Sequence, residues 1–437
     1  MLSARNIAAL GFMTFAMYLG AGNLIFPPFL GLQAGEHFAS GMAGFLLTGV
    51  GLPALALVMV ALVHGSDNLT AALPKPVATG FWVMVFIVIG PAFVIPRAIT
   101  VAYQFSFAPF VGEAALLPFT VVFCLVAIVF ALYPGKLVDT LGKWLTPMLV
   151  VILSVLAVTA FMSPASEALA AVGPYQDKAF TEGLTQGYMT MDALGSIGFG
   201  WIIFRAIREM GVECPRATAK YTLMAAVMYA VAMALVYLSL AYIGATSASL
   251  GPVFGNGGEI LTAFTLAHFG TLGSVLLGVV MILACLTTAI GVTTAGSEFY
   301  SRTFQPVTYS RSVWVTMIVA GLVANLGLEQ LLAITLPVVV VLHPVAIALL
   351  VIAPLRRRLT TLAVMAAVMT ALVFGSVDAL HILGKMPIAI DSWLAQYLPL
   401  YSDYAGWVVP SLLVIAMGAV VSRASRPVLA LQPSMKG

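Results

Sequence analysis

Long apolar runs separated by short polar breaks follow one another along the whole chain. A run of about 18 or more apolar residues is long enough to cross a bilayer as a helix. These runs are apolar on every face and do not alternate as strands do. We therefore expect an all-α polytopic membrane protein of about 12 transmembrane helices, at 7–33, 41–63, 78–108, 115–133, 143–162, 188–208, 220–244, 273–300, 312–328, 330–352, 359–380 and 404–422.

Composition agrees with this pattern, since 62% of the 437 residues are apolar and only 8% are charged. A soluble domain carries charge on roughly a quarter of its residues. We expect one membrane domain over 1–437. The three cysteines, Cys124, Cys214 and Cys285, have no metal-ligand spacing, so neither a disulfide framework nor a bound cofactor is indicated.

Lys and Arg fall on alternate loops, and the side that retains them during insertion is cytoplasmic. With both termini cytoplasmic, 16 of the 19 basic residues lie on that side; the exceptions are Lys178, Lys385 and Arg97. The net charge of +3 therefore reflects topology and does not indicate nucleic-acid binding. The segment from Ile388 to Tyr401 is predicted to lie at the membrane interface.

Two glycine clusters interrupt the apolar runs, Gly20-Ala21-Gly22-Asn23 in the first span and 195–200 (GSIGFG) in the sixth. Unwound backbone is tolerated in a membrane only where protein or a watery cavity satisfies its polar groups. The clusters open two sets of five helices, 1–162 and 188–352. Because five is odd, the second set would enter from the opposite side, giving an inverted repeat followed by two extra helices at 359–422.

Broken helices expose amides that can hold a carboxylate and carbonyls that can hold a small cation. This pattern favours an amino acid and sodium as ligands, although glycines also permit close packing. In the eighth span, Thr287 and Thr288 place two hydroxyls in an apolar helix. Such oxygens suit a hard cation, but membrane threonines also bond carbonyls of their own helix.

Three motifs resemble those of the bacterial branched-chain amino acid carriers: 10–16 (LGFMTFA), 20–28 (GAGNLIFPP) and 284–289 (ACLTTA). The similarity runs nearly end to end and is weakest in the last two spans. It implies uptake of leucine, isoleucine and valine with sodium or protons across the bacterial inner membrane. It also implies a LeuT-like fold with spans 1 and 6 broken.

The resemblance also implies a site between the two breaks. Sodium would bind the carbonyls of Ala16, Leu19 and Ala284 and the hydroxyls of Thr287 and Thr288. The substrate carboxylate would lie on the amides of Ala21 and Gly22, its amino group near carbonyls around Gly195 and Ser196, and its side chain against Phe199 and Ile197. The full substrate set is Gly20, Ala21, Gly22, Asn23, Gly195, Ser196, Ile197 and Phe199.

Asn23 matches a residue that coordinates a second sodium in some LeuT-fold relatives. The companion position in span 6 is Leu194, which offers no side-chain oxygen, so we expect one cation. A cap on the half-helix that follows the break is the alternative role for Asn23.

Three further polar residues have open roles. Arg97 lies inside the third span and must face a cavity or a partner; it would touch substrate, gate the outer vestibule or bond carbonyls freed by nearby prolines. His343 is a candidate proton relay. Glu298 would pair with a basic residue as an inner gate or stay solvated at its helix end.

The chain has no phosphate-binding G-x-x-x-x-G-K-[ST] loop, so an ion gradient must supply the energy. A symporter or exchanger of another small neutral solute is the alternative within transport; a channel and a membrane enzyme are alternatives outside it. An enzyme would need a nucleophile–base pair or metal ligands, and the five histidines show no i, i+4 spacing. We expect a small-molecule substrate and contact with lipid, without catalytic residues, nucleic acid or an obligatory protein partner.

Overall fold

The structure is a computed structural model that describes residues 2–63, 65–251, 253–356 and 358–424. All regular elements in these ranges are helices, which confirms the expected all-α class. The α-helices are α1 (Ala4–Tyr18), α2 (Ala21–Ala34), α3 (Phe38–Leu46), α4 (Leu52–Leu62), α5 (Lys75–Ile87), α6 (Val94–Ser106), α7 (Ala108–Val111), α8 (Leu116–Leu132), α9 (Pro134–Met162), α10 (Tyr175–Met189), α11 (Asp192–Glu209), α12 (Pro215–Ala245), α13 (Gly257–Thr303), α14 (Tyr309–Ala324), α15 (Leu328–Ile352), α16 (Thr361–Ile382), α17 (Ile388–Tyr397) and α18 (Val408–Ala424).

Within the described part of the chain, six helical stretches are long and apolar enough to cross a membrane: Gly22–Leu62, Lys75–Ser106, Pro215–Ala245, Gly257–Thr303, Leu328–Leu355 and Thr361–Ile382. Four shorter apolar helices accompany them: Leu116–Leu132, Pro147–Met162, Tyr309–Ala324 and Val408–Ser422. The total of about twelve spans and the division into two repeats stay predictions.

Two spans bend through π-helical turns. In the second, Leu47–Gly51 joins α3 to α4; in the third, Val88–Ala92 joins α5 to α6. Pro91 lacks a backbone donor and Gly90 has non-helical backbone angles, so the helix bends there. Helix α13 turns at Gly270, whose φ is +64°, and the part that follows covers the predicted eighth span.

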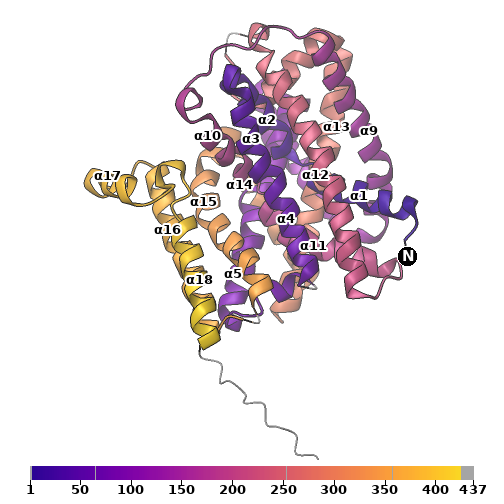
Figure 1. Cartoon of the computed structure of the whole chain (residues 1–437). Helices are drawn as coiled ribbons and strands as arrows, with labels where there is room; N and C mark the ends of the chain where they lie inside the picture. Colours follow the sequence, from indigo (N-terminus) through magenta and orange to yellow (C-terminus); the bar gives the residue numbers. More distant parts are fainter. Residues whose placement is uncertain (1, 64, 252, 357, 425–437) are drawn as a thin grey trace, which may run out of the picture.

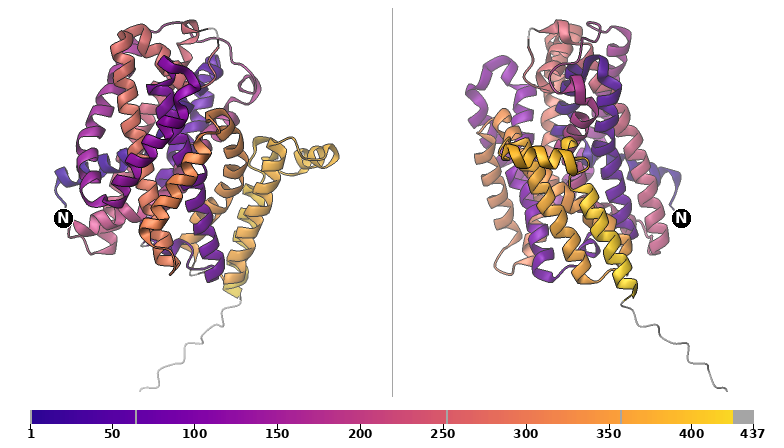
Figure 2. Two further views of the ribbon diagram at one scale, coloured as in Figure 1. Left: turned by 180° about the vertical axis from the view of Figure 1, so that it is seen from behind. Right: turned by 60° about the vertical axis from the view of Figure 1, so that its left-hand side comes forward.

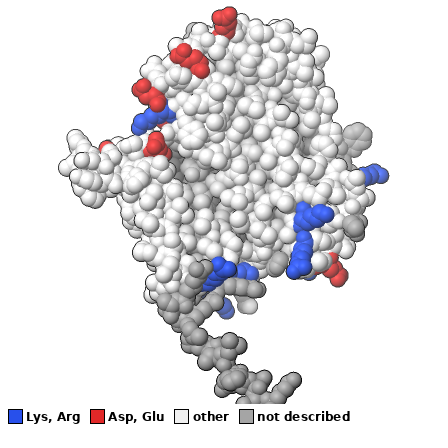
Figure 3. All heavy atoms as spheres, in the orientation of Figure 1, with Lys and Arg blue, Asp and Glu red and all other residues white. Residues whose placement is uncertain are grey.

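Large apolar side chains face outward on the bundle. Val122 on α8, Leu235 on α12 and Leu322 on α14 are between 61% and 71% exposed. Lys and Arg gather toward the end of the molecule where α18 finishes, whereas most Asp and Glu lie toward the opposite end (Figure 3). A surface that is apolar in the middle and charged at its ends fits a bilayer.

Glycines let α3 and α10 pack with their backbones in contact. A Cβ on Gly183 would overlap the carbonyl oxygen of Gly41, and one on Gly44 would overlap that of Phe180. Gly183 and Gly187 are four residues apart and face the same helix, which is the small-xxx-small arrangement of membrane helix pairs. The first half of span 6 is thereby fixed against span 2.

The last helices, α16 to α18, stand as a flank on one edge of the bundle, with α17 projecting sideways (Figures 1 and 2). Trp393 and Tyr397 on α17 are 59% and 62% exposed, which suits the interfacial position predicted for this segment. The loop before α18 bonds to α10, because Lys178 donates to the Ser402 carbonyl at 2.9 Å and Thr181 to the Asp403 carboxylate at 2.8 Å.

Candidate functional site

The first span breaks where the glycine cluster predicted. Helix α1 ends at Tyr18 and α2 starts at Ala21, with Leu19 and Gly20 between them. Gly20 has an extended backbone and gives α2 no side-chain cap. The first amides of α2 therefore lack side-chain partners, and the positive end of this half-helix points into the break.

The predicted position of the break in the sixth span was wrong. The backbone leaves the helix at Thr190 and Met191, between α10 and α11, where Met191 has a left-handed φ of +62°. Gly195, Ser196, Ile197 and Phe199 lie inside α11, one to two turns beyond the break. Glycines here serve packing, since a Cβ on Gly200 would press on Val60 of α4.

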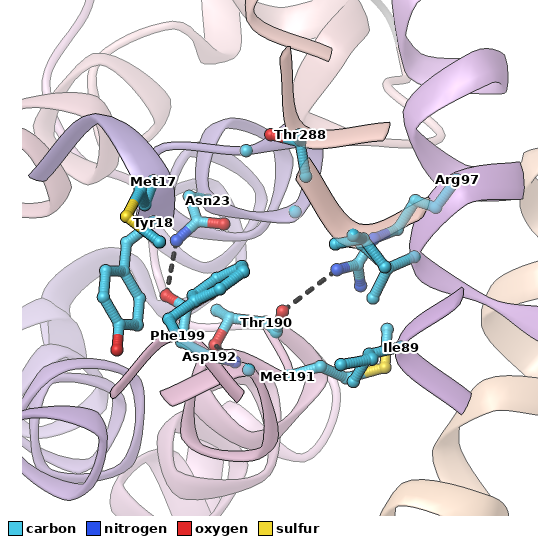
Figure 4. A pocket seen from close by; sticks show the side chains of 15 residues that line it. Met17, Tyr18, Asn23, Ile89, Arg97, Thr190, Met191, Asp192, Phe199 and Thr288 are labelled. Atoms are coloured by element: carbon cyan, nitrogen blue, oxygen red, sulfur yellow. Dashed lines mark hydrogen bonds between the residues drawn. The ribbon is translucent and has the colours of Figure 1, made fainter. Parts of the chain in front are cut away.

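The two breaks enclose a cavity of about 30 Å³ (Figure 4). Its lining comes from α1, α2, α6, α11, α13 and both breaks, and consists of Met17, Tyr18, Gly20, Gly22, Asn23, Ile89, Val94, Arg97, Thr190, Met191, Asp192, Gly195, Phe199, Thr288 and Val292. By this measure one water needs at least 10–15 Å³, so the space takes about two waters. A leucine-sized ligand requires the lining to move apart.

The cavity lining contains five of the eight predicted substrate residues: Gly20, Gly22, Asn23, Gly195 and Phe199. Ala21 begins α2 beside them. Ser196 and Ile197 are fully buried and lie outside the lining. The Ser196 hydroxyl accepts from Tyr18 at 2.8 Å and donates to the Asp192 carbonyl at 2.7 Å, so it joins α1 to α11.

Of the predicted sodium ligands of span 8, Thr288 lines this cavity, and Ala284 and Thr287 lie outside the lining. The hydroxyls of Thr287 and Thr288 donate to the Ala284 carbonyl at 2.8 Å and 3.1 Å. A Cβ on Gly20 would lie 3.2 Å from the Thr288 hydroxyl, so that hydroxyl borders the first break, next to Leu19. Ala16 lies in the last turn of α1.

Asn23 pairs with an acidic residue and not with Leu194. Its amide donates to the Asp192 carboxylate and to the Tyr237 hydroxyl, both at 2.5 Å. The Tyr237 hydroxyl lies 3.2 Å from the same carboxylate oxygen. The expectation that Leu194 is the companion of Asn23 in span 6, which came from the resemblance, was therefore wrong. Its alternative role as a helix cap is also wrong, since Gly20 is the N-cap of α2.

Arg97 reaches from α6 to the end of α10. It donates to the carbonyls of Met189 at 2.5 Å and Thr190 at 3.0 Å, and it lies over the Phe26 ring. These carbonyls end the first half of span 6, where a positive charge complements the helix dipole. They are not the carbonyls freed by the prolines of Arg97's own span.

Asp192 could have been predicted as a site residue from its residue type alone. A carboxylate inside a membrane span marks a functional position by default. The prediction instead followed the glycine cluster, which begins three residues downstream at Gly195. Tyr18 and Tyr237 carried no comparable signal. The other two polar residues with open roles contact nearby side chains. Glu298 pairs with exposed Arg302 at 3.6 Å, and the ring of buried His343 packs against that of Tyr188.

Comparison with known proteins places residues 3–425 in the family described as branched-chain amino acid transport protein. A Pseudomonas aeruginosa relative, "Branched-chain amino acid transport system 2 carrier protein", is 42% identical over 97% of both chains. "Branched-chain amino acid permease BrnQ" of Escherichia coli strain K12 is 38% identical over 97% of both chains. "Branched-chain amino acid permease BraB" of Bacillus subtilis is 36% identical over 96% of both.

Two solved structures share the fold at low identity. The nucleobase-cation-symport-1 transporter Mhp1 matches with a TM-score of 0.59 and 15% identity, over 96% of this chain and 93% of that one. MhsT, solved with L-phenylalanine, matches with a TM-score of 0.58 and 16% identity, over 94% and 98%. The likeness confirms the LeuT-like fold.

Proposed function

Because the chain belongs to the branched-chain amino acid transport protein family, we propose that it carries leucine, isoleucine and valine into the cell with sodium by alternating access. As a member of this family it is a transport protein and not an enzyme. The membrane is the bacterial inner membrane, with both termini on the cytoplasmic side. Two broken helices that meet at one cavity carry this proposal.

The substrate carboxylate binds the uncapped start of α2, on the amides of Ala21 and Gly22. Backbone amides at a helix start favour an anion because of their geometry and the helix dipole. The aliphatic side chain lies among the apolar lining, chiefly Phe199, Met17 and Val292. Such a pocket distinguishes aliphatic substrates by their size, since each methylene contributes about 1–3 kcal/mol.

Sodium binds between α1 and α13, on the carbonyls of Ala16, Leu19 and Ala284 and the hydroxyls of Thr287 and Thr288. The position of the Thr288 hydroxyl beside Gly20 at the first break supports this site. The bonds of both hydroxyls to the Ala284 carbonyl would open when sodium binds. A charge crossing about 100 mV gains roughly 2.3 kcal/mol, which sustains about 50-fold accumulation of a neutral substrate. One sodium per substrate is therefore sufficient.

The test is uptake of radiolabelled leucine into proteoliposomes that contain the purified protein. An inward sodium gradient is compared with a matched potassium gradient at constant pH. Sodium-dependent accumulation that excess valine abolishes is the expected result. Accumulation only under an imposed proton gradient would replace sodium by protons, and failure under both would favour another small neutral solute.

A further inference from the structure

Two buried side chains of opposite charge face the cavity without forming an ion pair. Arg97 is 3% exposed and Asp192 is 8% exposed, and both belong to the lining (Figure 4). Among the described residues, Arg97 bonds only to neutral carbonyls, and Asp192 accepts side-chain hydrogen bonds only from a neutral amide and a hydroxyl. Buried charges in a membrane usually pair with each other, so this separation needs a reason.

The broken helix explains how each charge is tolerated alone. Arg97 lies at the carbonyl end of α10, and Asp192 is the first residue of α11. A helix dipole favours a cation at its C-terminal end and an anion at its N-terminal end. Each charge is therefore stabilised by one helix end at the same break. Neither needs the other as an ion-pair partner, so both can bind a charged ligand.

Each group also retains unused hydrogen-bonding capacity. The Arg97 Nε atom is buried and has no acceptor among the described residues. The Asp192 Oδ2 atom takes the bonds from Asn23 and Tyr237, whereas no described residue donates to Oδ1. A buried donor without an acceptor is costly, and a ligand that completes it gains affinity.

We propose that Arg97 and Asp192 form a clamp for a zwitterion, in which Asp192 binds the α-ammonium group and Arg97 binds the α-carboxylate. This inference rests on the proposed function and defines the substrate class of the same cavity. The arrangement fits the first break, because a Cβ on Gly22 would lie 2.6 Å from an Arg97 nitrogen. The guanidinium is thus beside the α2 amides that receive the carboxylate.

The clamp makes both charged groups of the substrate necessary. An acid without the amine leaves Asp192 without its cation, and an amine without the carboxylate leaves Arg97 without its anion. Removing one partner from a buried charge contact weakens binding by about 30-fold or more. The protein should therefore bind 4-methylpentanoate and 3-methylbutylamine, which keep the leucine side chain, at least about 30-fold more weakly than leucine.

The test measures ligand binding to the purified full-length protein in sodium, as the ligand-dependent rise of Tm. Leucine, 4-methylpentanoate and 3-methylbutylamine are titrated against wild type, Asp192→Asn, Asp192→Glu and Arg97→Gln. In Asp192→Asn, we expect leucine affinity to fall about 30-fold or more while 4-methylpentanoate affinity stays within about twofold. Arg97→Gln should lower leucine affinity without changing that of 3-methylbutylamine, and Asp192→Glu should recover part of the leucine affinity.

Asp378→Asn is the matched control, because Asp378 is a fully buried carboxylate in α16 that lies outside the cavity lining. It should bind all three compounds like wild type. If Asp192→Asn lowers the affinities for leucine and 4-methylpentanoate equally, Asp192 is only a structural cap and the clamp is overturned. A change confined to the sodium dependence of leucine binding would also overturn it, by assigning Asp192 to a cation. If wild type itself fails to bind leucine, the proposed function fails first.

Discussion

The two broken helices of this transporter meet at one cavity but differ in backbone geometry and in chemistry. The break in span 1 has glycine at Gly20 and Gly22 and no side-chain cap. The break in span 6 has no glycine, and Met191 takes the left-handed conformation there. The Thr190 hydroxyl donates to the Gly187 carbonyl before the break and accepts from the Asp192 amide after it. Arg97 donates to the Met189 carbonyl at the end of α10. One break leaves its backbone available to ligands, and the other is closed by side chains that carry charge.

The largest effect is expected where the two breaks touch. In Gly22→Ala, the added Cβ would lie 2.6 Å from the Arg97 guanidinium and push it away from the carbonyls of span 6. A hydrogen bond to a charged group contributes about 1.5–3 kcal/mol, so leucine affinity should fall about 30-fold. Equilibrium binding of labelled leucine measures this. Gly198→Ala is the control, since its Cβ would meet only Phe86 at 3.9 Å; equal losses in both variants would refute the contact.

The next largest effect is expected at the break in span 1, whose backbone is available to ligands. Thr288→Val removes the hydroxyl beside Gly20 with little change of volume, so the sodium concentration for half-maximal uptake should rise about tenfold. Sodium-dependent leucine uptake in proteoliposomes gives this value. Thr293→Val, on the same helix with its hydroxyl against the Met317 sulfur, should leave it unchanged. An unaltered sodium requirement in both Thr287→Val and Thr288→Val would remove the proposed sodium site.

A smaller effect is expected at the break in span 6, which is closed by side chains. The Thr190 hydroxyl donates to the Gly187 carbonyl at 2.8 Å and lies 3.3 Å from the Asp192 amide, so it acts as a cap. Thr190→Val should lower the free energy of unfolding by about 1 kcal/mol, which denaturant unfolding of the detergent-solubilised protein can measure. Thr190→Ser should keep most of that stability. If both variants are as stable as wild type, side-chain capping does not hold this break.

The smallest effect is expected at Gly20. Its φ of −110° is open to any residue, and an added Cβ would approach the Thr288 hydroxyl to 3.2 Å. Gly20→Ala should change stability by less than about 0.5 kcal/mol and raise the half-maximal sodium concentration only about twofold. Unfolding and uptake curves measured beside those of Gly22→Ala check this. A larger loss than in Gly22→Ala would reverse the order of the two glycines.

The comparison also shows what the sequence could reveal. Apolar runs predicted the helical class, and the glycines of span 1 marked its break, because both signals are local. Helix α10 was missed since it is polar: its buried face includes Thr181, Gly183 and Thr185, which meet protein instead of lipid. A half-helix enclosed by other helices need not be apolar, so a search for apolar runs passes over it.

The position of the second break could not be read from residue types. Met191 adopts its conformation because neighbouring helices and Arg97 hold the chain ends, which is a tertiary effect. The structure also gives Asn23 a different companion, which is Asp192 and not the expected Leu194. The two threonines of span 8 are visible as a group because they are adjacent in sequence, and their role as sodium ligands stays a prediction.

The glycine contacts between α3 and α10 have a mechanical consequence. Backbones that meet through Gly41, Gly44 and Gly183 interlock and do not slide past each other. When α10 tilts about its break, α3 must tilt with it as one lever. The second half-helices of these spans, α4 and α11, also pack on each other, so such a tilt would need a pivot in span 2 at the matching level. We expect the π turn at Leu47–Gly51 to act as that pivot, since its hydrogen bonds are already rearranged.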